Sequence, residues 1–217
     1  MTHDGHAPFS PAEAAQRLRG ALTFDLPADV FDAPIWPPQG DHALNPDLSL
    51  APVKAKPAAV LFPLVAHDDG VHVLLTQRTS KLRNHAGQVA FPGGRMDAED
   101  ASPAHTALRE AHEEIGLEHT HVDTLGYLDP YQSGTGYRII PVVAMVRPGF
   151  SLTINPHEVD EAFEVPLSFL MSEANQFRHR WERDGVTRES WAMTYDDRLI
   201  WGVTAGIIRR MWERHYR

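Results

Sequence analysis

The sequence predicts an α/β protein in which a mixed β-sheet lies between helices, an α/β/α sandwich. Two observations support this prediction. Strand-like and helical segments alternate with mixed connections and no internal repeat, and 217 residues suffice for one domain with a substantial core but are short for two. We expect residues 1–57 to form an N-terminal helix and a proline-rich arm that pack on the domain, and residues 58–217 to form the domain itself.

The composition excludes several classes of protein. The chain has no cysteine, which rules out disulfides, thiolate metal sites and cysteine nucleophiles. Its N-terminus lacks a basic region followed by an apolar run, so we expect no signal peptide and a cytoplasmic location. No apolar stretch approaches the roughly 20 residues that span a bilayer, so no membrane partner is expected. The formal charge of −9 argues against a nucleic-acid partner.

The sequence predicts a helix over residues 10–22. Ser10 and Glu13 form a capping box, and Pro11 suits the first helical position. The apolar stripe of this helix contains Ala14, Ala15, Leu18 and Leu22. We expect the helix to pack on the domain or on the second subunit of a homodimer.

The next segment, residues 27–57, is rich in proline and lacks periodicity. This pattern is typical of an extended arm across the surface, with Phe31, Ile35 and Trp36 as its anchors. The same composition fits a linker, and the sequence leaves both interpretations open.

A hairpin opens the predicted sheet. Residues 59–65 and 71–76 are its strands, and Asp68, Asp69 and Gly70 form its turn. Pro63 suggests that the first strand lies at an edge or carries a bulge. Further strands are predicted at 88–91, 122–128, 137–146, 151–154 and 190–195, and helices at 167–171 and 199–215.

A helix over residues 102–116 organises the chain. Ser102 can cap it, Pro103 suits its first position, and Gly116 stands where a left-handed residue would end it. At 100° per residue its apolar side chains share one side, which should pack on the core. These side chains are Ala104, Ala107, Leu108, Ala111 and Ile115.

Glu110, Glu113 and Glu114 share another side of this helix, one turn apart. Each like-charge pair at these spacings costs roughly 0.2–0.5 kcal/mol, and the helix dipole disfavours anions in its last half. A solvated surface is the ordinary alternative, but a hard divalent cation removes the repulsion and also binds substrate phosphates. The spacing therefore predicts a Mg²⁺ or Mn²⁺ site on this side.

The stretch from the glycine turn at residues 93–94 to the end of this helix resembles the Nudix box. That box reads glycine, five residues, Glu, seven residues, Arg-Glu, an aliphatic, any residue, Glu-Glu, any residue, Gly and an aliphatic. The downstream half matches from Arg109 onwards, with Ala111 as a small stand-in for the aliphatic. The upstream half is out by one: five residues separate Gly94 from Asp100, as in the box, but eight residues and not seven separate Asp100 from Arg109. This departure leaves the roles of Glu99 and Asp100 open.

The segment before the box is cationic. Residues 70–96 contain no Asp or Glu but include Arg78, Lys81 and Arg83. Because the whole chain is acidic, we expect this stretch to bind an anion. The alternative is a chance gap on the surface.

Several stretches resemble the coenzyme A pyrophosphatase branch of the Nudix hydrolases. They are residues 74–78, 82–83, 87–94, 133–137, 141–143 and 200–205, and the extra residue before Arg109 is a feature of that branch too. The resemblance covers roughly residues 58–210. It implies a Nudix-type sandwich and Mg²⁺- or Mn²⁺-dependent hydrolysis of the pyrophosphate in coenzyme A or its thioesters. The products would be 3′,5′-ADP and 4′-phosphopantetheine or its acyl form.

The resemblance also implies roles for the box residues. Glu110 and Glu114 would be the principal metal ligands, and Glu113 would complete the cluster. Arg109 would orient a glutamate by a forked ion pair. The general base would be a box glutamate, Glu110 or Glu113, or the later loop acid Glu158.

The substrate-binding residues implied by the resemblance lie outside the helix. Gly93 and Gly94 would let the backbone approach the metal and phosphates. Arg78, Lys81 and Arg83 would hold the diphosphate or the 3′-phosphate, unless they are surface cations. A glycine-containing segment with Ser133 and Tyr137 is either a ligand loop or a hairpin connection.

Two other functions remain open. One is a Nudix hydrolase for another nucleoside diphosphate derivative, such as ADP-ribose or NADH. The other is a Nudix module that senses a nucleotide without cleaving it, although such modules often lose the box glutamates that this chain keeps.

Overall fold

The computed structural model describes residues 9–32, 40–46, 55–81, 85–183 and 185–217. The long strands of its main sheet are β1 (Lys56–His67), β2 (Gly70–Arg78), β5 (Val122–Tyr127), β7 (Tyr137–Val146) and β8 (Val159–Pro166). Three short strands join them, namely β3 (Val89–Ala90), β4 (Gly93–Arg95) and β6 (Tyr131–Gln132).

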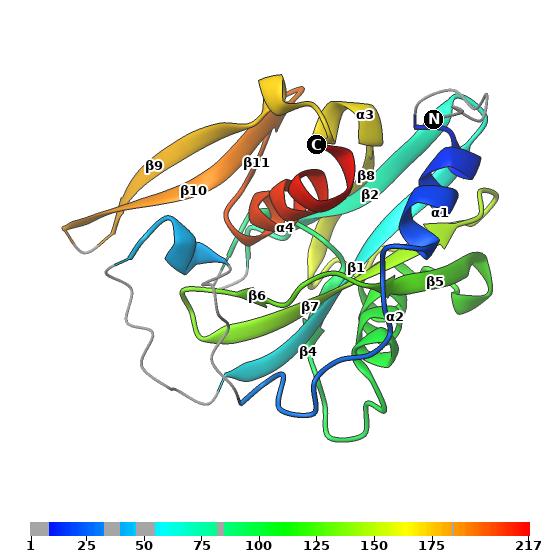
Figure 1. Ribbon diagram of the computed structural model, residues 1–217, viewed down its shortest axis with the longest axis horizontal. Helices are drawn as coiled ribbons and strands as arrows, with labels where there is room; N and C mark the ends of the chain where they lie inside the picture. Colours follow the sequence, from blue (N-terminus) through cyan, green and yellow to red (C-terminus); the bar gives the residue numbers. More distant parts are fainter. Residues whose placement is uncertain (1–8, 33–39, 47–54, 82–84, 184) are drawn as a thin grey trace.

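The main sheet is mixed, as the sequence predicts. Its central order is β3-β2-β1-β7-β5, with β4 also pairing with β1, β6 with β7 and β8 with β2. β1 and β7 run parallel, whereas β1 and β2 form the predicted antiparallel hairpin. Figure 1 shows β1 crossing the molecule, with β4 near one of its ends and the hairpin turn at the other.

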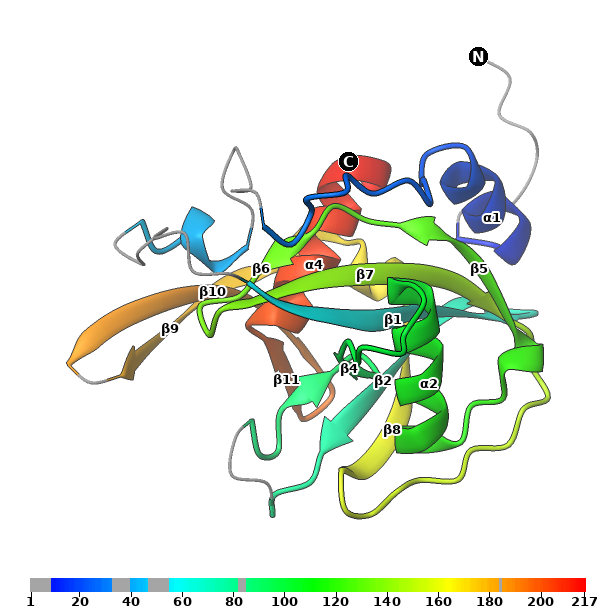
Figure 2. The ribbon, with the colours of Figure 1, turned by 90° about the horizontal axis from the view of Figure 1, so that it is seen from below.

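Helices cover both faces of this sheet, which confirms the sandwich (Figure 2). α2 (Pro103–Ile115) packs on one face. The other face carries α1 (Pro11–Arg19), α3 (Leu167–Leu170), α4 (Val203–Met211) and the π-helical segment η4 (Trp212–Tyr216). Short 3-10 turns are η1 (Asp41–Ala43), η2 (His119–His121) and η3 (Glu173–Asn175). No helix among the described residues is long and apolar enough to cross a membrane.

The sheet separates two apolar cores because neighbouring strand residues point to opposite faces. In β1, Leu61 and Val65 belong to the core under α2, whereas Phe62 and Leu64 belong to the core under the other helices. All four side chains are fully buried.

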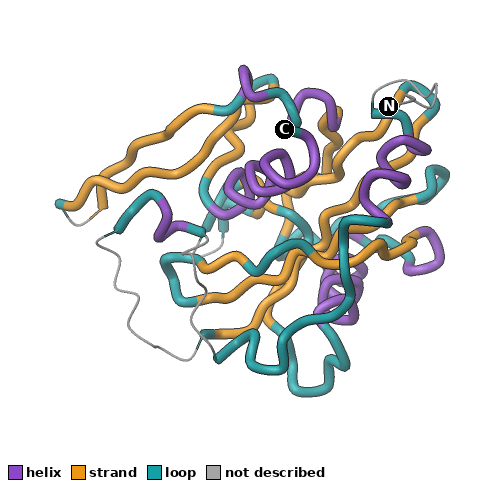
Figure 3. The backbone as a smooth tube through the Cα atoms, in the orientation of Figure 1, coloured by secondary structure: helices purple, strands orange, loops and turns teal. Residues whose placement is uncertain are grey.

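A second, three-stranded antiparallel sheet extends from one end of the molecule (Figures 1 and 3). It contains β9 (Phe177–Arg183), β10 (Val186–Tyr195) and β11 (Arg198–Trp201). The sequence indicated only the second half of β10. The prediction of a helix over 199–215 is wrong at its start, because residues 199–201 pair with β10 and the helix begins only after Gly202.

Two strand predictions also need correction. Pro63 lies in the interior strand β1, between the residues that pair with β4 and those that pair with β2. A residue without a backbone N–H is tolerated there because β1 changes partners at that point. Residues 151–154 do not form a strand; Leu152 and Ile154 pack on the α2 core from a loop.

The N-terminal residues lie against the main sheet. Ser10 caps α1 by accepting a hydrogen bond from the Glu13 N–H, and Ala14 and Leu18 are fully buried. The helix ends at Arg19, before the predicted residue 22. Further on, Phe31 packs against the α2 core, whereas the other predicted anchors, Ile35 and Trp36, lie outside the described residues.

Candidate active site

The caps of α2 place its glutamates beside the glycine turn. Ser102 accepts a hydrogen bond from the His105 N–H at the start of the helix, and Gly116 ends it in the left-handed region at φ 67°. Ala107, Ala111 and Ile115 bury the predicted apolar side. The neighbouring side of the helix, which carries Glu110 and Glu114, lies against the glycines of β4.

The three box glutamates differ in burial. Glu114 is 3% exposed, and its Oε2 accepts a hydrogen bond from the Gly93 N–H at 3.1 Å. Glu110 packs so closely on Gly94 that a Cβ there would lie 2.5 Å from its carboxyl carbon. Glu113 lies at the rim, with its side chain 52% exposed. Gly93 and Gly94 therefore form a cradle that only residues without side chains can supply.

Burial raises the pKa of Glu114 to about 8, a shift that its hydrogen bond from Gly93 and the nearby Arg78 only partly offset. Burial also raises the pKa of Glu110, and the charges of Glu113 and Glu158 add to that effect. Arg78 Nη1 lies 3.7 Å from Glu114 Oε1. Burial and the neighbouring carboxylates thus both disfavour the ionised forms of Glu110 and Glu114, and a cation bound between them would favour those forms.

Arg109 is anchored by Asp100. Its Nε and Nη2 donate to the two carboxylate oxygens of Asp100 at 3.1 and 2.9 Å, and this contact holds the pKa of Asp100 well below its usual range. Nη1 donates to Glu110 at 3.0 Å and to Glu113 at 3.2 Å. The fork expected for a glutamate therefore goes to Asp100, and each glutamate receives a single hydrogen bond.

The donor set of this side of α2 fits Mg²⁺ or Mn²⁺, since both prefer carboxylate oxygens. Glu110, Glu113 and Glu114 could hold the ion beside Gly93 and Gly94, which also line the neighbouring cavity. The oxygens of Glu110 and Glu113 share Arg109 Nη1, so a bound ion would compete with that contact.

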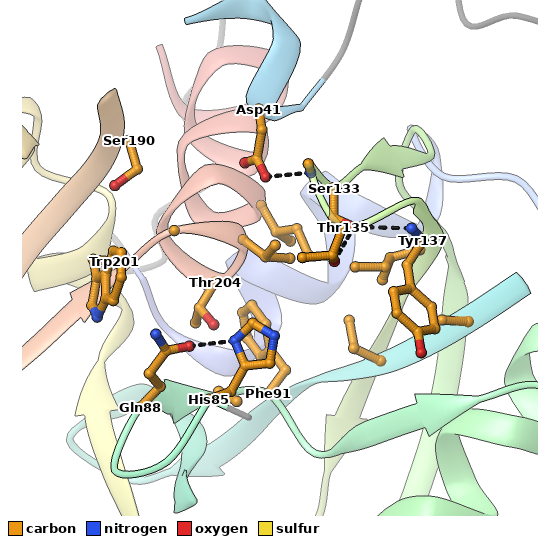
Figure 4. Close-up of a pocket in the computed structure, with 18 of the residues that line it drawn as sticks. Asp41, His85, Gln88, Phe91, Ser133, Thr135, Tyr137, Ser190, Trp201 and Thr204 are labelled. Carbon is orange, nitrogen blue, oxygen red and sulfur yellow. Dashed lines mark hydrogen bonds between the residues drawn. The ribbon is translucent and has the colours of Figure 1, made fainter. Parts of the chain in front are cut away.

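A cavity of about 1050 Å³ begins at the glycine turn. Gly93, Gly94 and Arg78 line its near end, together with Ser133 and Tyr137. Figure 4 shows these last two side chains on one wall.

The loop that carries Ser133 is fixed from two sides. Ser133 Oγ accepts a hydrogen bond from the Tyr137 N–H at 3.0 Å. Asp41, from the N-terminal arm, accepts from the Gly134 N–H at 2.7 Å and from the Tyr131 hydroxyl at 2.8 Å. The loop is thus an ordered wall of the cavity.

The far end of the cavity reaches the second sheet. Trp181, Val186 and Trp201 line it there, and the two tryptophan rings lie edge to face with centroids 5.7 Å apart. The sequence pattern does not mark Asp41 or Trp181 as site residues. Trp201 lies in a stretch quoted for the family resemblance, but nothing in the sequence pattern links Asp41 to residue 134.

The remaining predicted residues lie as follows. Glu158 is half-buried at the start of β8, where its carbonyl accepts a hydrogen bond from the Thr79 N–H at 2.9 Å. Its charge reaches Glu110 and Glu114. Lys81 is exposed in the turn after β2 and does not line the cavity. Arg83 lies outside the described residues.

Comparisons with known proteins agree with this arrangement. A family model described as the NUDIX domain matches residues 55–189. The uncharacterized Nudix hydrolase NudL of Photorhabdus laumondii is 45% identical over 154 residues, which cover 71% of this chain and 82% of that protein. The NudL protein of Escherichia coli K12 is 39% identical over 168 residues, covering 77% of this chain and 87% of the relative.

Among solved structures, a MutT/nudix family protein from Enterococcus faecalis shares 20% identity at a TM-score of 0.47, covering 75% of this chain and 62% of the other. The family model alone spans more than half of the chain. The chain therefore belongs to the Nudix family and is a hydrolase of nucleoside diphosphate derivatives.

Proposed function

We propose that this protein hydrolyses the pyrophosphate bond of coenzyme A or its thioesters, with Mg²⁺ or Mn²⁺ as the cofactor. The observation that carries the proposal is the volume of the cavity together with the chemistry of its lining. About 1050 Å³ slightly exceeds the roughly 300–1,000 Å³ of small-molecule sites. It is polar and cationic at the glycine turn and aromatic at its far end.

This gradient fits coenzyme A better than ADP-ribose. Both substrates carry an adenosine diphosphate, but coenzyme A continues into a pantetheine arm that ends in a thiol or thioester, whereas ADP-ribose ends in a sugar. Trp181, Val186 and Trp201 offer apolar contact to the arm, and Glu189 and Ser190, which line the same cavity, can form hydrogen bonds with its amide groups. The stretches quoted above for the coenzyme A pyrophosphatase branch point the same way.

Hydrolysis of the pyrophosphate bond needs no covalent intermediate with the protein. The oxygen of water bonds to one phosphorus, the bridging P–O bond breaks, and a water proton passes to a base. A divalent ion bound here would neutralise the diphosphate and lower the pKa of the attacking water. Glu110, Glu113 and Glu114 would hold that ion, and Arg109 orients Glu110 and Glu113 through its hydrogen bonds to both.

Two residues outside α2 complete the proposed mechanism. Arg78 lies between Glu114 and the cavity, where its guanidinium can bind a phosphate oxygen. Glu158 accepts the proton, because it is a half-buried carboxylate just before β8 whose charge acts on Glu110 and Glu114.

We also propose that residues 1–57 are an appendage of a catalytic domain at 58–217. Support comes from α1, which buries Ala14 and Leu18 against the main sheet, and from Asp41, which anchors one wall of the cavity.

The deciding experiment incubates the purified protein with coenzyme A and Mg²⁺ or Mn²⁺ and identifies the products by mass. We expect 3′,5′-ADP and 4′-phosphopantetheine. A parallel panel includes acetyl-coenzyme A, ADP-ribose and NADH, with the Glu114→Gln variant as the control for contaminating activity. A clear preference for ADP-ribose or NADH would overturn the coenzyme A proposal but leave a Nudix hydrolase. Tight binding without turnover would indicate a sensing module.

A further inference from the structure

A second group of metal-binding side chains lies far from the glutamates of α2. His67, His72 and Glu164 each present one ligand atom, and these three atoms all lie within 4.8 Å of one another. Among the described residues, no other trio of His, Cys, Asp and Glu side chains meets this distance. The group is therefore more compact than the glutamates of the active site.

The strand register explains why these three side chains meet. His72 pairs with Val65 of β1, and His67 lies two residues beyond Val65, so the two histidines share one face of the sheet. Glu164 of β8 pairs with Leu74, which lies two residues beyond His72. Three adjacent strands thus contribute one ligand each to the face that also carries α2.

The group is separate from the active site. The glycine turn pairs with Val60 near the start of β1, and His67 ends that strand seven residues later. At ~3.3 Å per residue the separation is about 23 Å along the strand. Figure 1 shows β4 and the β1–β2 turn near opposite ends of β1.

The distances suit a tetrahedral ion with small adjustments. His67 Nε2 and His72 Nδ1 lie 2.5 and 3.6 Å from the same oxygen, Glu164 Oε2. Ligands about 2.0–2.2 Å from a tetrahedral ion stand roughly 3.3–3.6 Å apart, so the contact of His72 with Glu164 already has this spacing and that of His67 would need to open. The other ring nitrogen of His72 lies 3.9 Å from an oxygen of Asp69, which is too far for a direct hydrogen bond.

We propose that His67, His72 and Glu164 bind one Zn²⁺ ion that links β1, β2 and β8. Two imidazoles and one carboxylate are a ligand set that zinc accepts, whereas Mg²⁺ and Mn²⁺ prefer oxygen ligands. The three side chains are between 24% and 34% exposed, so water can reach the fourth coordination position of the ion. Because the ligands lie on paired strands, their geometry is set before the ion binds.

The test measures Zn²⁺ binding by calorimetry to protein first freed of metal with EDTA and then supplied with excess Mg²⁺ to occupy the glutamates. We expect one Zn²⁺ per chain and a higher melting temperature with Zn²⁺. His67→Gln, His72→Gln and Glu164→Gln should each weaken binding at least about tenfold and abolish the thermal shift. His119→Gln, which changes an exposed histidine outside the group, should bind as the wild type does.

Two further measurements keep the outcome unambiguous. Co²⁺ substituted into the wild type should give the visible spectrum of a tetrahedral site with nitrogen ligands, which does not depend on any variant folding. The Glu114→Gln variant should retain Zn²⁺ binding, because it alters only the active site. Zn²⁺ binding that is absent, that survives all three substitutions or that disappears in Glu114→Gln would overturn the proposal. None of these results bears on coenzyme A hydrolysis, which is assayed separately.

Discussion

Glu114 is the residue whose substitution tests the active site most directly. Glutamine has the same shape and can still accept the hydrogen bond from the Gly93 N–H, but it brings no charge to a metal. We expect Glu114→Gln to lower kcat at least about 100-fold while the protein stays folded. Steady-state kinetics with a melting curve check this, and Glu118→Gln, an exposed acid just past the helix, is the control. Undiminished turnover would remove the metal assignment.

Asp100 and Asp97 form a matched pair for the role of Arg109. Asp100 is 2% exposed at its side chain and takes the guanidinium fork, whereas Asp97 is 64% exposed and lies 3.5 Å from Nη2. Asp100→Asn should cost about 1–3 kcal/mol of unfolding free energy and lower kcat, because it frees Arg109 from its anchor. Asp97→Asn should cost less than about 1 kcal/mol. Urea unfolding and steady-state kinetics of both variants test this difference. Equal losses of stability and of kcat in the two variants would contradict the anchoring role of Asp100.

The buried carboxyl of Glu114 makes the stability of the metal-free protein depend on pH. Its pKa rises from an ordinary 4.5 to about 8 on folding, so between these values the folded chain binds more protons than the unfolded chain. The free energy of unfolding in EDTA should therefore fall as pH rises through this window, by at most about 1.4 kcal/mol per unit.

Urea unfolding in EDTA at about pH 5, 6, 7 and 8 measures this slope. Glu114→Gln removes this titrating group and should make the slope shallower, with a remainder from Glu110, whose pKa burial also raises. Excess Mg²⁺ favours the ionised carboxylate and should restore stability toward the alkaline end of the window. A metal-free stability that rises between these pH values would show that Glu114 does not titrate as its burial implies.

At the scale of elements, the close packing of β4 on α2 makes a sharp prediction. A Cβ at Gly94 would lie 2.5 Å from the carboxylate of Glu110, the mobile end of a side chain, so the protein can relax by moving the ligand. We expect Gly94→Ala to lower kcat about tenfold or more with little loss of stability. Gly20→Ala, where nothing lies within 4 Å of the added atom, should leave both unchanged. Wild-type kinetics in Gly94→Ala would exclude Glu110 as a ligand in this position.

A helix or strand can be predicted from the sequence when the residues that determine it lie within the element itself. α2 is recovered from Ser102 to Gly116 because caps, apolar spacing and charge all lie within the helix itself. β11 is missed because residues 199–201 share the apolar character of the helix that follows, and only pairing with β10 makes them a strand. The edge position or bulge predicted from Pro63 is wrong for the same reason. The sheet accommodates a proline in β1 because the strand changes pairing partners there, which is a property of the sheet and not of the local sequence.

At the scale of the molecule, the cavity joins segments that are far apart in the chain. Asp41 of the N-terminal arm holds the loop at residue 134. The second sheet contributes Trp181 to the lining of the same cavity that Gly93 and Gly94 line. The metal side of the site is local in sequence and could be predicted from spacing. The far wall of the cavity depends on contacts between residues distant in the sequence. Its residues, mostly aromatic and small polar, have no fixed spacing in the sequence from which a site could be predicted.

The far wall should set affinity for the pantetheine arm without affecting the chemistry. Trp201 lies against Trp181, and an aromatic side chain in contact with an apolar ligand contributes about 1.5–3 kcal/mol. Under the coenzyme A proposal, Trp201→Ala should raise KM for coenzyme A about tenfold and leave kcat within about twofold. The product 3′,5′-ADP carries no arm, so its inhibition constant should not change.

Phe24→Ala is the matched control, because this aromatic side chain is exposed and does not line the cavity. It should leave both constants at wild-type values. If Trp201→Ala raised KM and the inhibition constant of 3′,5′-ADP together, the tryptophan would contact the nucleotide and the orientation of the substrate would be reversed. If neither moved, the aromatic end of the cavity would have no part in binding. A change confined to coenzyme A would link the second sheet to recognition of the arm and α2 to cleavage of the diphosphate.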